Sequence, residues 1–168
     1  MEIESMRKSG VMKKPFILLA VLVILAYAGG CRLYKTENGL VFGIPDYEKR
    51  DIHVSHVDLD ILIKANELLP NESAWRKSYV SDCSQSNTLD LYCALETASV
   101  IVMGKYVHRQ PALQEVRFAI DDNYKDRWDK HRLVDFNSHS DTSFADIKHV
   151  LNVAISTVRR KITHNKTN

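Results

Sequence analysis

The sequence predicts a compact all-α bundle of about four helices with two long loops, and it leaves room for a minor β-hairpin. Apolar residues recur at helical spacing in four segments, and long polar stretches interrupt them. The residues beyond position 30 suffice for one domain with a core of its own. We expect a signal peptide at 1–30, a tether at 31–54, the helical domain at 55–164 and a tail at 165–168.

The first 30 residues have the pattern of an export signal. Two lysines precede an apolar run at 16–27, and small residues follow it. The run holds 12 residues, whereas a helix needs about 20 to cross the hydrocarbon core of a bilayer. A cleaved signal therefore fits the run better than a permanent span. Because Met12 opens the typical pattern, we expect residues 1–11 to lie upstream of the true start, for which Met6 is an alternative.

The segment Ala28-Gly29-Gly30-Cys31 resembles the lipobox of bacterial prolipoproteins, and the resemblance covers residues 12–31. It implies cleavage before Cys31, acylation of that cysteine and attachment to a membrane facing the periplasm. Arg32 follows, and in prolipoproteins of two-membrane bacteria the absence of Asp there implies sorting to the outer membrane. The family prefers Leu where this chain has Ala28. An ordinary signal-peptidase site after Ala28 and a retained membrane anchor therefore stay open as alternatives.

The chain has three cysteines, and an odd number in an exported protein leaves one without a partner unless it has another fate. Lipidation would account for Cys31, so that Cys83 and Cys93 remain to form a disulfide in an oxidising compartment. Closing so short a loop stabilises a fold by about 3 kcal/mol in the chain-entropy model. The alternative is a buried helix thiol at Cys93 and a free loop thiol at Cys83.

The charge of the chain does not predict a polyanion-binding protein. The 23 basic residues outnumber the 21 acidic ones, but the leader holds four of the former and two of the latter. The remaining charges cancel, so we expect no nucleic-acid partner.

The tether and the first helix come next. Asn38-Gly39 stands between short apolar segments and indicates a hairpin turn. Ser55 with Asp58 forms a capping box, which predicts a helix that ends before Pro70. Its apolar stripe comprises Val57, Ile61, Leu62, Ala65, Leu68 and Leu69.

Residues 70–88 are polar, and we expect a long loop there that Trp75 and Tyr79 pin to the domain. A second helix, at about 89–106, carries the most continuous apolar stripe and is expected at the centre of the core. Replacing Leu95 or Ile101 on it by Ala is therefore expected to cost about 2 to 5 kcal/mol. The stripe comprises Leu91, Ala94, Leu95, Ala98, Ile101 and Val102.

Pro111 suits the first turn of a third helix, which we expect to end at the polar residues 121–123. Residues 123–140 are expected to be irregular. A capping box of Ser143 and Asp146 then predicts a fourth helix. The elements Cys93-Ala94-Leu95 and Phe136-Asn137 are similar to features of uncharacterised small helical bacterial proteins, a resemblance that brings no activity with it.

Two candidate reaction sites can be weighed. Asp82-Cys83-Ser84 resembles the nucleophile segment of NlpC-type cell-wall peptidases, with His131 or His139 as the base, although Gln85 replaces the family's Gly and no strand-borne His is evident. Residues 131–141 hold side chains that can bind a metal, but their spacing matches no known site. Caps, turns and a structural disulfide are the favoured explanation of these residues.

Two further features have simple structural explanations. Trp75 and Trp128 could line a ligand groove, but large aromatics in helical domains are more often part of the core. The basic residues of segment 125–132 alternate with acidic ones and fit a solvated loop. We therefore expect a membrane-tethered envelope lipoprotein with a structural or protein-interaction role, an unknown envelope partner and no cofactor. The alternatives are an envelope hydrolase and a small-molecule binding module.

Overall fold

The computed structural model describes residues 24–25, 28–36, 39–85 and 87–165 of the chain. The predicted leader at 1–30 lies largely outside these residues. Within the described ranges, no helix combines the length and the apolarity that a membrane span needs. The chain divides into two compact units, Met1–Glu48 and Lys49–Asn168.

The first unit contains the minor hairpin that the sequence allowed. Strand β1 (Arg32–Thr36) pairs antiparallel with β2 (Gly39–Gly43), and a short 3-10 turn, η1 (Asp46–Glu48), follows. The register sets Thr36 opposite Gly39, at the closed end of the hairpin. Gly39 has a φ of 114°, a backbone conformation that residues other than glycine rarely adopt.

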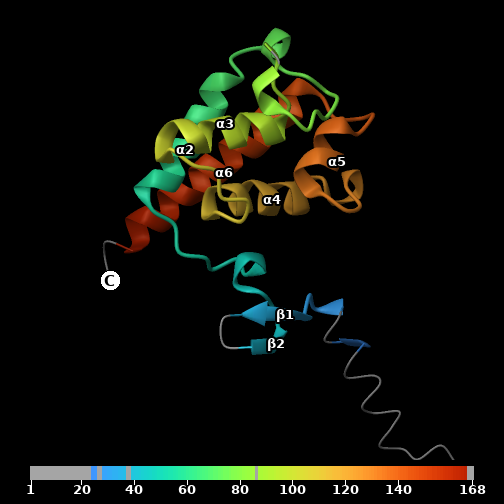
Figure 1. Cartoon of the computed structure of the whole chain (residues 1–168), viewed down its shortest axis with the longest axis vertical. Helices are drawn as coiled ribbons and strands as arrows, with labels where there is room; N and C mark the ends of the chain where they lie inside the picture. Colours follow the sequence, from blue (N-terminus) through green and yellow to red (C-terminus); the bar gives the residue numbers. More distant parts are fainter. Residues whose placement is uncertain (1–23, 26–27, 37–38, 86, 166–168) are drawn as a thin grey trace, which may run out of the picture. The chain divides into compact units, whose positions relative to one another are not determined.

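The second unit is an all-α domain, as predicted. Its described residues form five α-helices in a closed ring of contacts: α2 packs on α3, α3 on α5, α5 on α4, α4 on α6, and α6 on α2 (Figure 1). The first and last helices of the unit are therefore neighbours. The helices are α2 (His56–Leu68), α3 (Leu91–Met103), α4 (Pro111–Asn123), α5 (Arg132–Ser138) and α6 (Phe144–Asn165).

Side-chain caps fix where the helices begin. Asp58 accepts hydrogen bonds from the backbone N–H and the hydroxyl of Ser55 at the start of α2. The same carboxylate is buried and accepts from the backbone N–H of Ala112 at 3.1 Å, so it also ties α2 to the start of α4. At the start of α6, Asp146 accepts hydrogen bonds from the backbone N–H and the hydroxyl of Ser143 in the same manner. Both predicted capping boxes are therefore present.

The core of the helical unit contains most of the predicted apolar stripes. Leu95 is fully buried, but Ile101 is 54% exposed and Val57 is 43% exposed, so the assignment of these two residues to the core was wrong. Val54 is buried in this core, ahead of the first helix. The largest fully buried side chains are Phe136, Ile61, Leu62, Leu69, Leu91, Leu95, Leu113, Ile120, Leu133, Ile147, Leu151 and Val116.

One prediction about the middle of the chain was also wrong. The segment 123–140 is not irregular throughout, because α5 lies within it. A seven-residue helix is too short to show a periodic stripe, although Leu133 and Phe136 bury one side of it. Helix α4 ends at Asn123, within the stretch at which its end was predicted, and Asp121 pairs with Arg132 at 2.9 Å.

Candidate functional site

A disulfide joins the polar loop to α3. The Sγ atoms of Cys83 and Cys93 are 2.17 Å apart and their Cα atoms 5.2 Å apart, within the usual range for a bridge. Cys93 is fully buried in the first turn of α3, and Cys83 begins the 3-10 turn η3 (Cys83–Gln85). The pairing that the cysteine count predicted is thus present in the structure. While it is intact, Cys83 has no thiolate to serve as the nucleophile that the peptidase resemblance implied.

Asp90, the N-cap residue of α3, binds the part of the loop that precedes the disulfide. Its buried carboxylate accepts from the backbone N–H of Cys93 at 2.8 Å and from that of Val80 at 3.3 Å. The guanidinium of Arg76 lies 3.6 Å from the same carboxylate. The loop is therefore attached to the start of α3 at Arg76 and at Val80.

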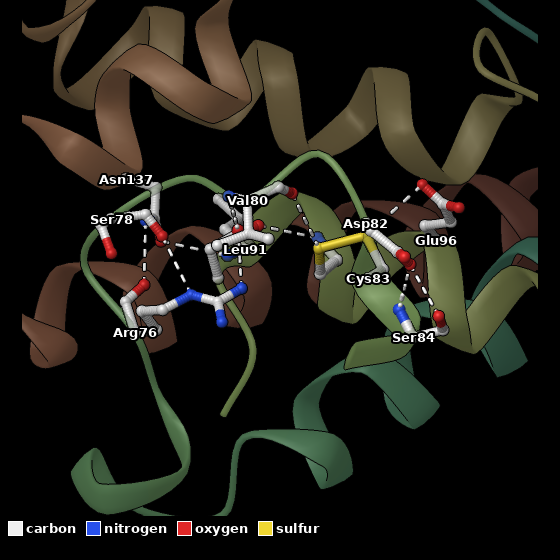
Figure 2. Close-up of a disulfide and its surroundings, with 11 residues drawn as sticks. Arg76, Ser78, Val80, Asp82, Cys83, Ser84, Leu91, Glu96 and Asn137 are labelled. Atoms are coloured by element: carbon white, nitrogen blue, oxygen red, sulfur yellow. Dashed lines mark hydrogen bonds and ion pairs between the residues drawn. A yellow bond between two sulfur atoms is a disulfide. The ribbon is translucent and has the colours of Figure 1, made fainter. Parts of the chain in front are cut away.

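Asn137 on α5 is a second attachment point, and its side-chain amide is fully used. Its Oδ1 accepts from the indole N–H of Trp75 at 2.8 Å and from the backbone N–H of Leu91 at 3.0 Å. Its Nδ2 donates to the carbonyl oxygens of Arg76 and Lys77 at 3.1 and 2.7 Å. In Figure 2 the disulfide lies between these contacts on one side and the carboxylate of Glu96 on the other.

A groove of about 570 Å³ runs along the outer side of α3, and we call it the α3 groove. The loop that carries the disulfide forms one wall, and the end of α2 contributes to the lining. Glu96 lines the groove, and its carboxylate Oε2 lies 3.7 Å from Sγ of Cys83 (Figure 2). The residues that line the groove are Leu68, Cys83, Ser84, Asn87, Leu89, Glu96, Thr97, Val100 and Ile101.

A separate aromatic and histidine cluster lies where the start of α3 meets the residues before α4 and α5. The rings of His108 and His131 are 5.7 Å apart, and both approach the ring of Tyr92. The hydroxyl of Tyr106 lies 2.9 Å from Nδ1 of His108. The guanidinium of buried Arg117 donates to the backbone carbonyl of His108 at 3.1 Å.

Burial and charge decide the protonation of this cluster. Desolvation and the positive charge of Arg117 lower the pKa of both His108 and His131. Desolvation and its proximity to Tyr92 raise the pKa of Tyr106. Both imidazoles therefore bind a proton at a lower pH than an ordinary histidine does. The members of the cluster are far apart in the sequence, and no spacing could have indicated that they meet.

The comparisons with known proteins give one match. A model of a family of unknown function matches residues 55–157, more than half of the chain. The chain belongs to this family, DUF6197. No curated protein and no solved structure matches it.

The DUF6197 segment runs from the cap of α2 into α6, and it contains both cysteines of the disulfide, Asn137 and the α3 groove. The hairpin and Cys31, which takes no part in the disulfide, precede it. The DUF6197 match thus covers the domain and leaves the predicted lipidation site outside.

Structural roles account for the predicted metal-site candidates of the DUF6197 segment. Asp135 accepts from the backbone N–H groups of 129–131, and burial, which would raise its pKa, is outweighed by these bonds. Nδ1 of His139 accepts from the backbone N–H of Asp141 at 3.2 Å. Among the described residues no cluster of His, Cys, Asp and Glu is suited to a metal. Trp75 and Trp128 are partly buried and pack against the core, as predicted.

Proposed function

We propose that this protein is a membrane-tethered envelope lipoprotein whose DUF6197 domain has a protein-interaction role. Acylated Cys31 would anchor the chain, with the domain facing the periplasm and the outer membrane as the favoured site. The division of the three cysteines carries the proposal: Cys83 and Cys93 share a disulfide, and Cys31 stands apart from it.

The physical chemistry of disulfides and lipid anchors supports this division. A disulfide persists in an oxidising compartment such as the periplasm and is rare in the cytosol. Each acyl methylene that enters a bilayer contributes about 0.8 kcal/mol, so several chains on one cysteine hold a protein firmly. Gly30, which has a φ of 84°, precedes Cys31. A lipobox requires a small residue at this position.

The organisation of the helical unit supports an interaction role. Several of the polar side chains that suggested chemistry in the sequence, such as His131 and Asn137, cap helices or fasten the loop. The α3 groove, in contrast, exposes apolar side chains of α3 opposite a loop wall that a disulfide and Asp90 hold in place. Exposed apolar surface next to polar side chains is a property of binding surfaces.

Metabolic labelling with a fatty-acid analogue tests the anchor. We expect the wild-type chain to take up the label and to begin at Cys31 after processing. Cys31→Ser is expected to abolish the label and to leave a precursor or a freely soluble domain, whereas the matched control Cys83→Ser keeps the label.

Two results would overturn the anchor. An unlabelled chain that begins at Gly29 would show simple secretion, and an unlabelled chain with its leader intact would show a retained membrane anchor. Either result leaves the fold of the helical domain unaffected, because its core begins beyond the hairpin.

A further inference from the structure

The outer side of α3 carries more apolar surface than the core of the domain uses. Val100 and Ile101 are 46% and 54% exposed, although they belong to the most apolar helix of the domain. Single exposed apolar residues are normal on protein surfaces. Here, however, the two residues share one groove with Leu68 and Leu89, which are partly buried and pack against the core. The exposed apolar surface of α3 is therefore concentrated in the α3 groove.

The wall opposite α3 is fixed in advance. Leu89 exchanges backbone hydrogen bonds with Ala74 and Arg76 at 2.9 Å each, and the disulfide holds Cys83 against α3. A groove with such a wall loses little conformational entropy when it is filled, which favours binding.

Glu96 gives the groove its charge. Its carboxylate contacts the disulfide sulfur of Cys83 at 3.7 Å, and no Lys or Arg of the described residues forms an ion pair with it. Glu96 and Thr97 occupy the turn of α3 before Val100 and Ile101, so the negative charge stands at one end of the apolar surface. A complementary ligand is apolar along most of its length and carries one positive charge.

The openness of the groove identifies the kind of ligand. Sites for small molecules enclose roughly 70 to 90% of the ligand surface, whereas Val100 and Ile101 face solvent over about half of theirs. A groove that follows residues 96–101 of α3, about one and a half turns of helix, suits a peptide segment that places apolar side chains at successive positions. We propose that the α3 groove docks an apolar, basic segment of a partner protein, and that a Lys or Arg of this segment pairs with Glu96. The inference rests on the proposed interaction role and is independent of the lipid anchor.

Selection of peptides on the purified full chain tests this assignment. The probe is a phage-displayed library of random peptides of about 12 residues, long enough to span such a groove. We expect enriched peptides to combine apolar residues with Lys or Arg. Their affinity, measured by fluorescence anisotropy, should fall at least about tenfold for Ile101→Asp and about tenfold for Glu96→Gln. Val57→Asp is the matched control, because Val57 is an exposed valine on α2 outside the groove.

A charge exchange completes the test. Glu96→Lys should reject the basic peptides and bind variants of them in which Glu replaces the basic residue. Enrichment of uncharged or acidic peptides, or equal binding to the wild-type chain and to Ile101→Asp, would overturn the assignment. A chain that self-associates until Ile101→Asp makes it monomeric would overturn it as well, because a second copy would then occupy the groove. Circular dichroism verifies that each variant is folded, and fatty-acid labelling reports separately on the anchor.

Discussion

The indole N–H of Trp75 donates to Oδ1 of Asn137 at 2.8 Å and thereby joins the long polar loop to α5. The two residues are 62 positions apart in the sequence. The same oxygen accepts from the first backbone N–H of α3, so a single side chain fixes the loop and two helices relative to one another.

Replacing Asn137 by Ala is therefore expected to destabilise the domain by about 2 to 4 kcal/mol, because buried donors lose their acceptor. Urea unfolding followed by tryptophan fluorescence measures this, and the emission of Trp75 should shift as its indole loses its partner. Asn152→Ala, at an exposed position of α6, is the control and should change stability by less than about 0.5 kcal/mol. An equally stable Asn137→Ala variant would show that the loop is held by other contacts alone.

Helix α3 has a buried side and an exposed side, and two substitutions distinguish them. Leu95→Ala is expected to cost about 2 to 5 kcal/mol, since Leu95 is fully buried. Ile101→Ala is expected to cost less than about 1 kcal/mol, since more than half of its side chain already faces solvent. Midpoints of denaturant unfolding compare the two directly. Similar losses from both variants would mean that Ile101 is buried in solution.

The disulfide is expected to contribute about 3 kcal/mol, because it closes a loop between residues 10 apart in the sequence. Cys83→Ser should lower the unfolding free energy by about this amount. Hydrogen exchange should speed up first in the loop before α3, where the bridge is the covalent attachment. Cys31→Ser, which removes a cysteine outside the bridge, should leave both measurements unchanged.

The histidine cluster predicts that the domain loses stability in mildly acidic solution. Desolvation and Arg117 lower the pKa of His108 and His131 in the folded chain below the ordinary value of 6.5. Well above pH 6.5 both imidazoles are neutral in the folded and in the unfolded chain, so they do not make the free energy of unfolding depend on pH. As the pH falls through 6.5, the unfolded chain binds protons first, so stability falls until the pH is below the folded pKa values. Thermal unfolding between pH 8 and about 4 measures the decline.

The double variant His108→Gln, His131→Gln should flatten this part of the pH profile. His53→Gln, at an exposed position, is the control and should retain it. A wild-type profile that is level between pH 7 and about 5 would contradict the predicted protonation of the cluster.

The lowered pKa of Asp146 leads us to expect a second loss of stability at lower pH. Burial alone would raise its pKa, but hydrogen bonds from Ser143, Tyr124 and Arg127 outweigh burial and lower the pKa to about 2. The stabilisation is complete above the ordinary value of 3.8 and disappears as the pH falls toward 2. Asp146→Asn should therefore be less stable than the wild-type chain at pH 5, and the difference should shrink at pH values near 2.

Local patterns predicted the elements whose signals lie within a few residues of one another. The capping boxes at Ser55 and Ser143 gave two helix starts correctly, because the residues that form a cap are three positions apart. The cysteine count gave the disulfide, because only one pairing remained once Cys31 was set aside.

The features that depend on distant residues could not be predicted in this way. Periodicity places Ile101 on the same stripe as Leu95, but the position of α2 and of the loop determines which part of that stripe is covered. The role of Asn137 could not be seen in the sequence, since its four partners are 46 to 62 positions away. The α3 groove has its walls on a loop and two helices, and no sequence motif marks it.

The contact between α2 and α6 affects the order in which this chain can fold during synthesis. Helix α2 buries one side against α6, and α6 is the last helix of the ring, so the core cannot close before α6 has been made. Contacts between segments so far apart along the chain form late. The short-range link between Cys83 and Cys93 cannot substitute for them, because it fixes only the loop to α3. Late closure of the core would be compatible with the export that we propose, because a chain that is still open can pass through a membrane channel that admits only unfolded polypeptide.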